Sequence, residues 1–500
     1  MSQMEVQKEM GAAHCEAPCE GQAIGKDSNG IKMHEEVELS PEEKRAERKL
    51  LWKLDLTLLP LLSLMYFLAS MDRGDIGNAA VAGMTKELEM TSQQYSNCVA
   101  FFYIGYIVFQ LPATIFIRKI QPQYQLGIAM IGWGMATAVM CKATDWGTIA
   151  GLRTVVGSFE AFLQAGVLYL TFWYKLDELA TRAAIFFAMS AVAGSMNGLI
   201  AYGIENDMKL VNGWLAWRWI FLIEGVISVG CGFIVMLLLP PVPERVRWMF
   251  SPAEKEIAIR RSKQAFNTPH TGIKVHQLIA VLKDRKIWCY AFFYSMMNIS
   301  LTSFSGFLPV ILRGLHYSSV RTQLLTIPVY VCIAITLILT GIASDKTKRR
   351  GVYLAGSFAL AAAGWLMLLI SKNRRLSYAG CFLVGMGTFP QVILIQSWMN
   401  VNVIGYTKRA GGLAFIMICG QCFAVMGLEI FTDAPKYHRG KGLGFTASAL
   451  SAMLVPVFML FINHLNKKKD KNQHSLEAAE KRRLGVEEIG DDHPDFRFWL

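Results

Sequence analysis

Four charged side chains lie in stretches that are otherwise strongly apolar. Asp72 and Arg73 end the first such stretch, and Arg153 and Glu160 lie within the fourth. A charge at bilayer depth is costly, so residues of this kind are candidates for function. A guanidinium grips a carboxylate through two parallel hydrogen bonds, and a carboxyl group can load and release a proton. We therefore interpret Arg73 and Arg153 as substrate-binding residues, and Asp72 and Glu160 as proton-coupling residues.

The spacing of Arg153 and Glu160 places them on one face of a helix. Seven residues make nearly two turns, so the two side chains would lie about 10 Å apart. If the first and fourth helices line one wet chamber, an acid and a substrate anion could compete for the same arginine. The sequence thus favours a small organic anion as the ligand and a proton as the coupling ion. The alternative interpretation is structural, in which these charges only neutralise one another and lock helices together.

Further polar residues lie within the apolar stretches. Gln164, Asn298 and Gln391 are predicted to read hydrogen-bonding groups of the substrate, although most such residues stabilise helix packing. Glu224 follows Arg218 by six residues, and we interpret these two as a structural pair.

A charged turn in the second half of the chain is a candidate gate. It runs from Gly341 to Gly351 and contains Asp345 and Arg349, both predicted to act in gating by latching one conformation. The alternative is a solvated charged turn without such a role.

About a dozen apolar stretches of roughly 20 residues carry these side chains, and each is long enough to cross a bilayer as a helix. They fall into two groups of six around a basic stretch. The predicted spans are 54–72, 93–116, 123–141, 147–173, 181–204 and 217–240, then 287–309, 322–343, 351–370, 377–397, 409–431 and 443–464. This pattern predicts an all-α membrane protein of twelve transmembrane helices in two pseudo-symmetric six-helix bundles.

The basic residues predict the orientation of the chain in the membrane. The linker 241–286 contains ten Lys or Arg, and an even number of crossings places both termini on its side. The positive-inside rule makes that side cytosolic. The predicted organisation is a disordered cytosolic tail (1–45), a first bundle (46–240), a linker with an amphipathic helix (241–286), a second bundle (287–465) and a cytosolic tail (466–500). The plasma membrane is the expected location, and a vacuolar or other internal membrane is the alternative.

Composition excludes several classes of function. The chain has 500 residues, of which 53% are hydrophobic and 18% charged, with a net charge of +12. No basic stretch is interleaved with base-stacking residues, so we expect no nucleic-acid partner. Cys419 and Cys422 form a C-x-x-C pattern, but it lies within an apolar stretch without a second ligand pair, and no G-x-x-x-x-G-K-[ST] motif is present. We expect no cofactor, no metal and no enzymatic activity, and a monomer in the lipid bilayer.

The Gly341–Gly351 turn resembles the cytoplasmic-loop signature of the major facilitator superfamily. Further stretches resemble the fungal allantoate permease branch of the anion:cation symporters. They are 71–79, 153–161, 217–225, 307–309, Ser397-Trp398 with Asn400, and 405–410. The resemblance implies twelve helices around an alternating-access cavity and transport of ureides, vitamins or other carboxylates, usually with protons. It also implies coupling and anion-binding roles for Asp72, Arg73, Arg153 and Glu160.

The sequence departs from that branch around Glu160. Asp75 stands where the branch usually has Asn, and Phe162, Gln164 and Ala165 also differ from the usual residues. The substrate of a relative therefore does not transfer to this chain. The leading prediction is proton-coupled import of a small organic anion. The alternatives are a proton-driven exporter of a secondary metabolite or toxin, a membrane-embedded enzyme, and a nutrient sensor.

Overall fold

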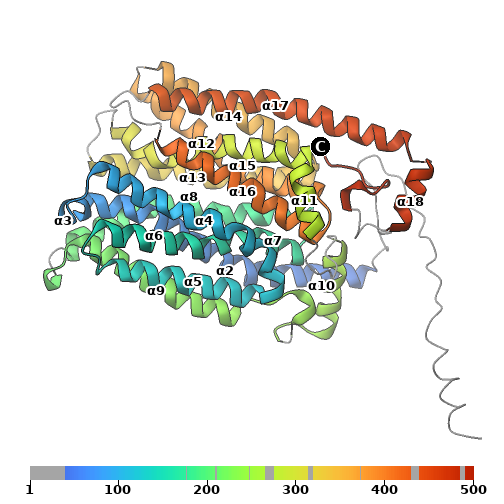
Figure 1. Cartoon of the computed structure of the whole chain (residues 1–500), viewed down its shortest axis with the longest axis horizontal. Helices are drawn as coiled ribbons and strands as arrows, with labels where there is room; N and C mark the ends of the chain where they lie inside the picture. Colours follow the sequence, from blue (N-terminus) through green and yellow to red (C-terminus); the bar gives the residue numbers. More distant parts are fainter. Residues whose placement is uncertain are drawn as a thin grey trace, which may run out of the picture.

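The long helices lie side by side along the longest axis of the molecule (Figure 1). The computed structural model describes residues 40–175, 177–208, 211–246, 248–264, 275–313, 319–371, 373–429, 438–473, 475–484 and 490–500. Within these ranges every regular element is helical. Most of the predicted tail 1–45, and the part of the linker from 265 to 274, lie outside them.

Each half of the chain contributes six membrane helices. The first half has α2 (Pro41–Val81), α4 (Ser92–Ile120), α5 (Pro122–Met140), α6 (Trp146–Glu160) extended by η1 (Ala161–Gln164) and α7 (Ala165–Trp173), α8 (Leu179–Met208) and α9 (Ala216–Leu238). The second half has α12 (Arg285–Arg313), α13 (Ser319–Thr347), α14 (Arg350–Ile370), α15 (Arg374–Asn402), α16 (Tyr406–Glu429) and α17 (His438–Lys471). Ten of these spans are long and apolar enough to cross a membrane, and α5 and α12 complete the twelve.

The two halves repeat one packing scheme. In the first half α2 packs on α8, α4 on α6, and α5 on α9. The equivalent pairs in the second half are α12 with α16, α13 with α15, and α14 with α17. The halves meet where α8 packs on α13 and α4 on α16. The predicted pair of pseudo-symmetric six-helix bundles is confirmed.

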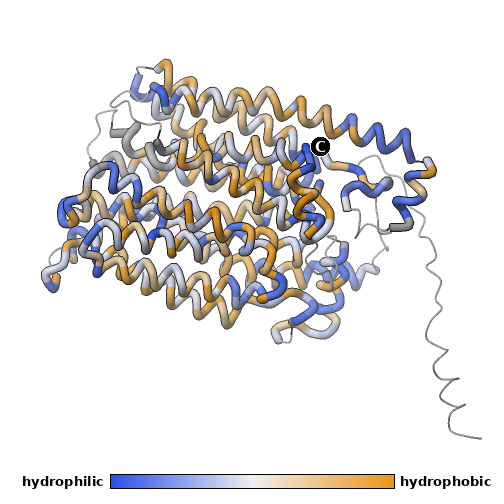
Figure 2. The backbone as a smooth tube through the Cα atoms, in the orientation of Figure 1, coloured by the Kyte–Doolittle hydropathy of each residue, from blue (hydrophilic) through white to orange (hydrophobic). Residues whose placement is uncertain are grey.

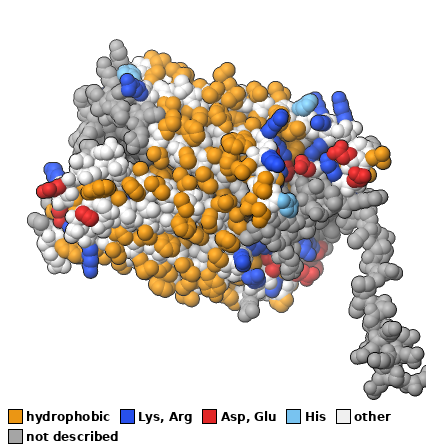
Figure 3. All heavy atoms as spheres, viewed as in Figure 1, with side chains coloured by type: hydrophobic (Ala, Val, Ile, Leu, Met, Phe, Trp, Pro, Cys, Tyr) orange, Lys and Arg blue, Asp and Glu red, His pale blue; other side chains and the backbone are white. Residues whose placement is uncertain are grey.

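Hydrophobic side chains cover the middle of the molecule. They form a broad belt in the space-filling view, and charged side chains gather at its two ends (Figure 3). Hydropathy along the backbone follows the same division (Figure 2). Exposed residues of this belt include Val108, Ile128, Leu237, Leu339 and Met453. A surface of this kind is stable only in contact with lipid.

The first membrane helix is longer than predicted at both ends. Ser40 starts α2 with a capping box, in which its hydroxyl accepts from the Glu43 amide and the Glu43 carboxylate accepts from the Ser40 amide. At the other end α2 continues to Val81. The sequence had suggested that Asp72 and Arg73 end the first membrane helix. In the structure they lie inside a continuous helix.

Short helices gather at one end of the bundle, which we call the linker end. They are α10 (Pro252–Gln264), α11 (Val275–Lys283) and α18 (Leu476–Leu484) (Figure 1). Arg261 of α10 is buried and forms ion pairs with Glu47 and Glu178 of the first half. Lys53 and Glu254 add a further contact at 2.8 Å between α2 and α10. The linker is thus fixed to the first half.

Candidate functional site

Arg73 and Glu160 form an ion pair inside the first half. The Arg73 Nε donates to Glu160 Oε2 at 2.7 Å, which joins α2 to the last residue of α6. The Arg73 guanidinium also lies 5.8 Å from the ring centre of Phe102 and 5.5 Å from that of Tyr106. The Glu160 side chain is fully buried, whereas 29% of the Arg73 side chain is exposed. Arg73 is thus the member of the pair that an incoming anion can reach.

Arg153 and Asp72 make a second contact between α2 and α6. The Arg153 Nη1 donates to the backbone carbonyl of Asp72 at 3.1 Å and lies 3.9 Å from its Oδ2. Thr137 of α5 donates to Asp72 Oδ1 at 2.8 Å. Arg153 is only 2% exposed and Asp72 is equally buried. In this conformation the pair is packed among helices, and the Nε and Nη2 of Arg153 form no hydrogen bond with a described residue.

The structure brings the four predicted charges together but pairs them across helices. Arg153 and Glu160 belong to one helix, and each faces a different residue of α2. Their shared face follows from helical periodicity alone. The partners depend on how α2 packs against α6, which the spacing within one helix does not encode.

The predicted polar residues lie at different depths around this cluster. Gln164 is buried beside Tyr66, close to the Arg73–Glu160 pair. Asn298 donates to the Tyr294 carbonyl at 2.9 Å within its own helix, and the Tyr294 hydroxyl accepts from Gln396 at 3.1 Å. Asn298 is therefore engaged within the second half.

Gln391 on α15 is completely buried, and its amide forms no hydrogen bond with a described residue. A buried amide without partners is costly and marks a place where a ligand or water can bond. Of the three predicted amides, Gln391 has the strongest need for a partner.

Asp75 and Glu224 form a carboxyl pair that the sequence did not reveal. Both are buried, and the carboxyl group of Asp75 interacts with that of Glu224 on α9. The expected pairing of Glu224 with Arg218 is wrong, because Arg218 bonds Glu87 at 2.9 Å and the Cys141 carbonyl. The replacement of the usual Asn by Asp75 was the only sequence signal for this pair.

Asp345 lies at a junction between the two halves. Its carboxylate accepts from the backbone N–H groups of Ala180 (3.2 Å) and Thr181 (2.7 Å), at the start of α8. Helix N-termini favour anions because their N–H groups are unpaired and the helix dipole is positive there. The arginine that contacts Asp345 is Arg350, at 3.2 Å, whereas Arg349 is exposed. The predicted latch contact therefore involves the neighbouring arginine.

A second junction lies at the start of α16. The Tyr406 hydroxyl donates to the Ile115 carbonyl of α4 at 2.8 Å, and the Arg118 guanidinium lies over the Tyr406 ring. Both junctions lie near the linker end, so the two halves are joined there in this conformation. Such contacts must break if the halves are to rock apart.

The fold and the buried charges define a class of protein. Two six-helix halves, paired charges in the core and contacts that join the halves at one end are typical of secondary transporters. No group of three or more His, Cys, Asp or Glu that could hold a metal occurs in the ranges that the structure describes.

Comparison with known proteins gives the family. The model of the Major Facilitator Superfamily matches residues 62–427, so the chain belongs to this superfamily. It is 31% identical to an uncharacterized transporter of Schizosaccharomyces pombe, over 91% of this chain and 90% of that protein. It is also 31% identical to the MFS-type transporter cnsO of Penicillium expansum, over 91% of each chain.

A more distant relative has a named substrate. The high-affinity nicotinic acid transporter of Saccharomyces cerevisiae is 28% identical, over 90% of this chain and 85% of that protein. Among solved structures, the proton:xylose symporter XylE has a TM-score of 0.61 at 14% identity, covering 82% of this chain and 96% of that one. The chain is thus a multi-pass membrane transporter, and the alternative of a membrane-embedded enzyme is rejected.

Proposed function

We propose that this transporter imports a small organic anion together with protons, as an anion:cation symporter of the allantoate permease type. The observation that carries the proposal is the Arg73–Glu160 ion pair, in which the arginine is partly exposed and the acid is buried. An incoming carboxylate can replace Glu160 on the guanidinium once Glu160 takes up a proton. Substrate binding and protonation would then favour each other.

The surroundings of Arg73 support a planar substrate. Phe102 and Tyr106 flank the guanidinium, and aromatic faces stack on flat groups. The nicotinic acid transporter among the relatives carries a name that fits such a ligand. Gln164, Asn298 and Gln391 are proposed to contact its polar groups. Asp75 and Glu224 offer a second place where one proton can be shared between two carboxyls.

We also propose an orientation for the chain. The linker end, with segments 1–45, 241–286 and 466–500, would face the cytosol of a monomer in the plasma membrane, because Lys and Arg concentrate there. Asp345 would then belong to a cytosolic gate. Protease digestion of intact and opened cells that carry a C-terminal epitope tests this, because the epitope should be cleaved only after the cells are opened.

Uptake of labelled acids tests the proposed import. Cells with and without the chain are given nicotinate, a ureide carboxylate and an aliphatic carboxylate, at about pH 5 and about pH 7.5. Import predicts accumulation that is higher in acid and collapses with a protonophore. Arg73→Gln should abolish it, whereas Arg48→Gln, at an exposed position of α2, should not.

Two results would count against the proposal. Equal accumulation at both pH values, with no effect of the protonophore, would show that protons are not coupled. Lower retention in cells that carry the chain would indicate export. Either result leaves the family assignment untouched, because that assignment is independent of the direction of transport.

A further inference from the structure

A basic cavity lies at the linker end, remote from the Arg73–Glu160 pair. It has a volume of about 680 Å³, within the roughly 300–1,000 Å³ typical of ligand pockets. Its walls come from the ends of α11, α12, α16, α17 and α18 and from residues 490–500, which we call the C-terminal segment. Seven Lys or Arg line it, namely Lys283, Arg285, Lys286, Lys408, Lys468, Lys469 and Lys481. Three acids, Asp284, Glu477 and Asp492, also line it, and the buried Asp491 pairs with two of the seven cations, which leaves an excess of three positive charges.

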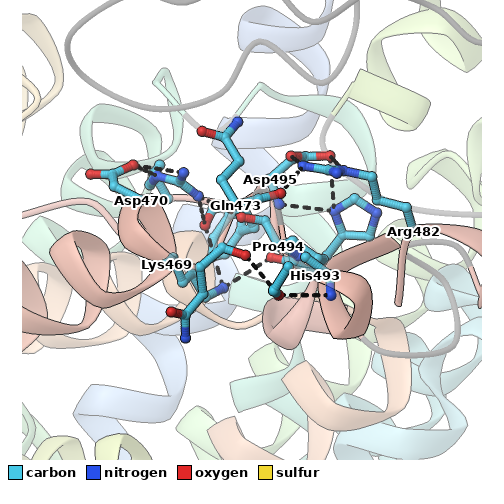
Figure 4. Close-up of polar contacts among 12 residues, drawn as sticks. Lys469, Asp470, Gln473, Arg482, His493, Pro494 and Asp495 are labelled. Atoms are coloured by element: carbon cyan, nitrogen blue, oxygen red, sulfur yellow. Dashed lines mark hydrogen bonds and ion pairs between the residues drawn. The ribbon is translucent and has the colours of Figure 1, made fainter. Parts of the chain in front are cut away.

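The C-terminal segment is bound firmly enough to act as a wall. Asp491 is fully buried and forms ion pairs with Lys286 and Lys408. The Lys469 ammonium donates to the carbonyls of Asp491 (2.6 Å) and His493 (3.0 Å). Figure 4 shows this lysine next to the segment, and it shows Arg482 of α18 donating two hydrogen bonds to the Asp495 carboxylate. Wall residues Asp492, Pro494 and Phe498 are held by these contacts.

Three of the seven cations remain available to a ligand. Lys286 and Lys408 are neutralised by Asp284 and Asp491, and Lys481 bonds Glu477 at 2.5 Å. Lys469 is occupied by backbone carbonyls. By contrast, Lys283, Arg285 and Lys468 form no hydrogen bond or ion pair with any carboxylate of the described residues. A ligand with several negative charges fits this arrangement.

The cavity opens where a lipid-facing surface ends. On α17 the exposed side chains of Met453, Val457 and Leu460 follow a helical stripe that continues through His464 to Lys468. Phe461 and Leu465 of the same helix line the cavity. A molecule with acyl chains beside this stripe would place its headgroup at Lys468.

The α12 side of the cavity has the same order of apolar and basic groups. Arg285 begins α12, and Trp288 follows one turn later with half of its surface exposed. The Trp288 indole donates to the Leu282 carbonyl at 2.8 Å, which fixes the ring at this boundary. Tryptophan is enriched at the level of lipid headgroups. On both helices, apolar side chains lie on the side of the lipid-facing belt, and cations follow toward the linker end.

We propose that this cavity binds the headgroup of an anionic phospholipid that carries two or more phosphate monoesters, with its acyl chains along α12 and α17. Each phosphate monoester brings a charge of about −1.5 to −2, so two of them balance the excess of positive charge. Lys283, Arg285 and Lys468 bind the phosphates, and Phe461 and Leu465 contact the glycerol region. Basic pockets between membrane helices bind headgroups in this way.

Lipid binding is linked to docking of the C-terminal segment. The segment forms part of the wall, so a lipid that binds the complete cavity stabilises the docked state by mass action. Lys408 lies two residues from Tyr406, which joins α16 to α4. The lipid would therefore favour the conformation that is closed at the linker end.

Nanodiscs of phosphatidylcholine with and without phosphatidylinositol 4,5-bisphosphate test the site on the purified full chain. Both leaflets of a nanodisc contain the lipid, so the result does not depend on the proposed orientation or on transport. A photoactivatable analogue should crosslink to α12 or α17, and hydrogen exchange in residues 490–500 should slow. Replacing Lys283, Arg285 and Lys468 together by Gln should weaken binding about 150-fold, at about 1 kcal/mol per cation.

A matched variant distinguishes specific binding in the cavity from nonspecific electrostatic attraction of anionic lipid to the basic end of the molecule. Lys44, Arg48 and Lys49 are exposed at the same end of the molecule, on α2, and their replacement by Gln removes the same charge. The proposal requires that this variant bind normally. Equal weakening of both variants would show unspecific adsorption and overturn it. Competition by soluble inositol trisphosphate as strong as by the lipid would also overturn it, because the acyl chains would then contribute nothing.

Discussion

Asp345 and Thr181 join the two halves of the transporter through a single carboxylate. The Asp345 Oδ2 lies 2.7 Å from both the backbone nitrogen and the hydroxyl oxygen of Thr181, at the first turn of α8. Arg350 bonds the other carboxylate oxygen from the side of the second half. The carboxylate is thus held by a helix N-terminus on one side and a guanidinium on the other, and both favour its ionised form.

Replacement of Asp345 by Asn should loosen this junction. The variant loses the charge that binds the α8 N-terminus, which we expect to weaken closure by about 2 kcal/mol. Ser344 is fully buried beside the junction, so the thiol introduced by Ser344→Cys should then react faster with a maleimide. The control is Ser344→Cys combined with Arg349→Gln in place of Asp345→Asn, because Arg349 is exposed. Unchanged labelling in the Asp345→Asn protein would refute the latch.

Replacement of Glu160 by Gln should separate binding from coupling. The introduced amide would mimic the protonated acid and leave the Arg73 guanidinium free for the anion. We expect exchange of labelled for unlabelled substrate to persist while accumulation against a gradient is lost. Glu256→Gln, at an exposed position of α10, is the control for the change of charge. Retained uphill accumulation in the Glu160→Gln protein would remove Glu160 from the coupling mechanism.

Replacement of Arg153 by Gln should destabilise the protein. The buried Asp72 carboxylate would lose its guanidinium partner, and an uncompensated buried charge costs about 3–5 kcal/mol. We expect a lower melting temperature in detergent and less protein in the membrane. Addition of Asp72→Asn should restore most of the stability, because the charge is then removed. A normal melting temperature with loss of transport would instead support the substrate-binding role predicted from the sequence.

The sequence predicted those features that depend on residues close together in the chain. The helix count, the two halves and the shared face of Arg153 and Glu160 follow from hydropathy and helical periodicity. The side-chain partners of the buried charged residues could not be predicted from hydropathy or helical periodicity. Arg73 meets Glu160, and Asp75 meets Glu224, only because particular faces of α2, α6 and α9 pack together. Two consecutive arginines gave no indication that Arg350 would contact Asp345 and Arg349 would not.

The C-terminal segment shows another limit of hydropathy. The sequence predicted only a charged cytosolic tail at 466–500, whereas in the structure Phe496 and Phe498 are buried and Asp491 is fully enclosed. Charged residues far away in the chain, such as Lys286 and Lys408, compensate Asp491. The aromatic residues among the last five positions were the available signal, because a solvated tail has no need for them.

The buried His493 makes docking of the C-terminal segment sensitive to pH. Its side chain is 6% exposed, and its Nδ1 accepts a hydrogen bond from the Asp495 amide at 3.3 Å. Burial lowers the pKa of His493, and Lys469 and Arg482 lower it further, which together outweigh the opposite effect of Asp495. The docked histidine is therefore neutral under conditions in which a free one begins to take up a proton.

Docking of the C-terminal segment should accordingly weaken as the pH falls below about 6.5, the ordinary pKa of histidine. The undocked segment binds more protons in that range, so docking loses at most about 1.4 kcal/mol per pH unit until the docked pKa is reached. Asp491 does not contribute to the pH dependence of docking in this range. Burial would raise its pKa, but Lys286 and Lys408 hold it below the ordinary value, so its contribution is lost only in stronger acid.

Hydrogen exchange in residues 496–499 should therefore quicken between about pH 7.5 and about pH 5.5 after correction for the intrinsic rate. His493→Gln should abolish this change and His464→Gln, an exposed position on α17, should keep it; a pH response that survives in the His493→Gln protein would assign the effect to another group.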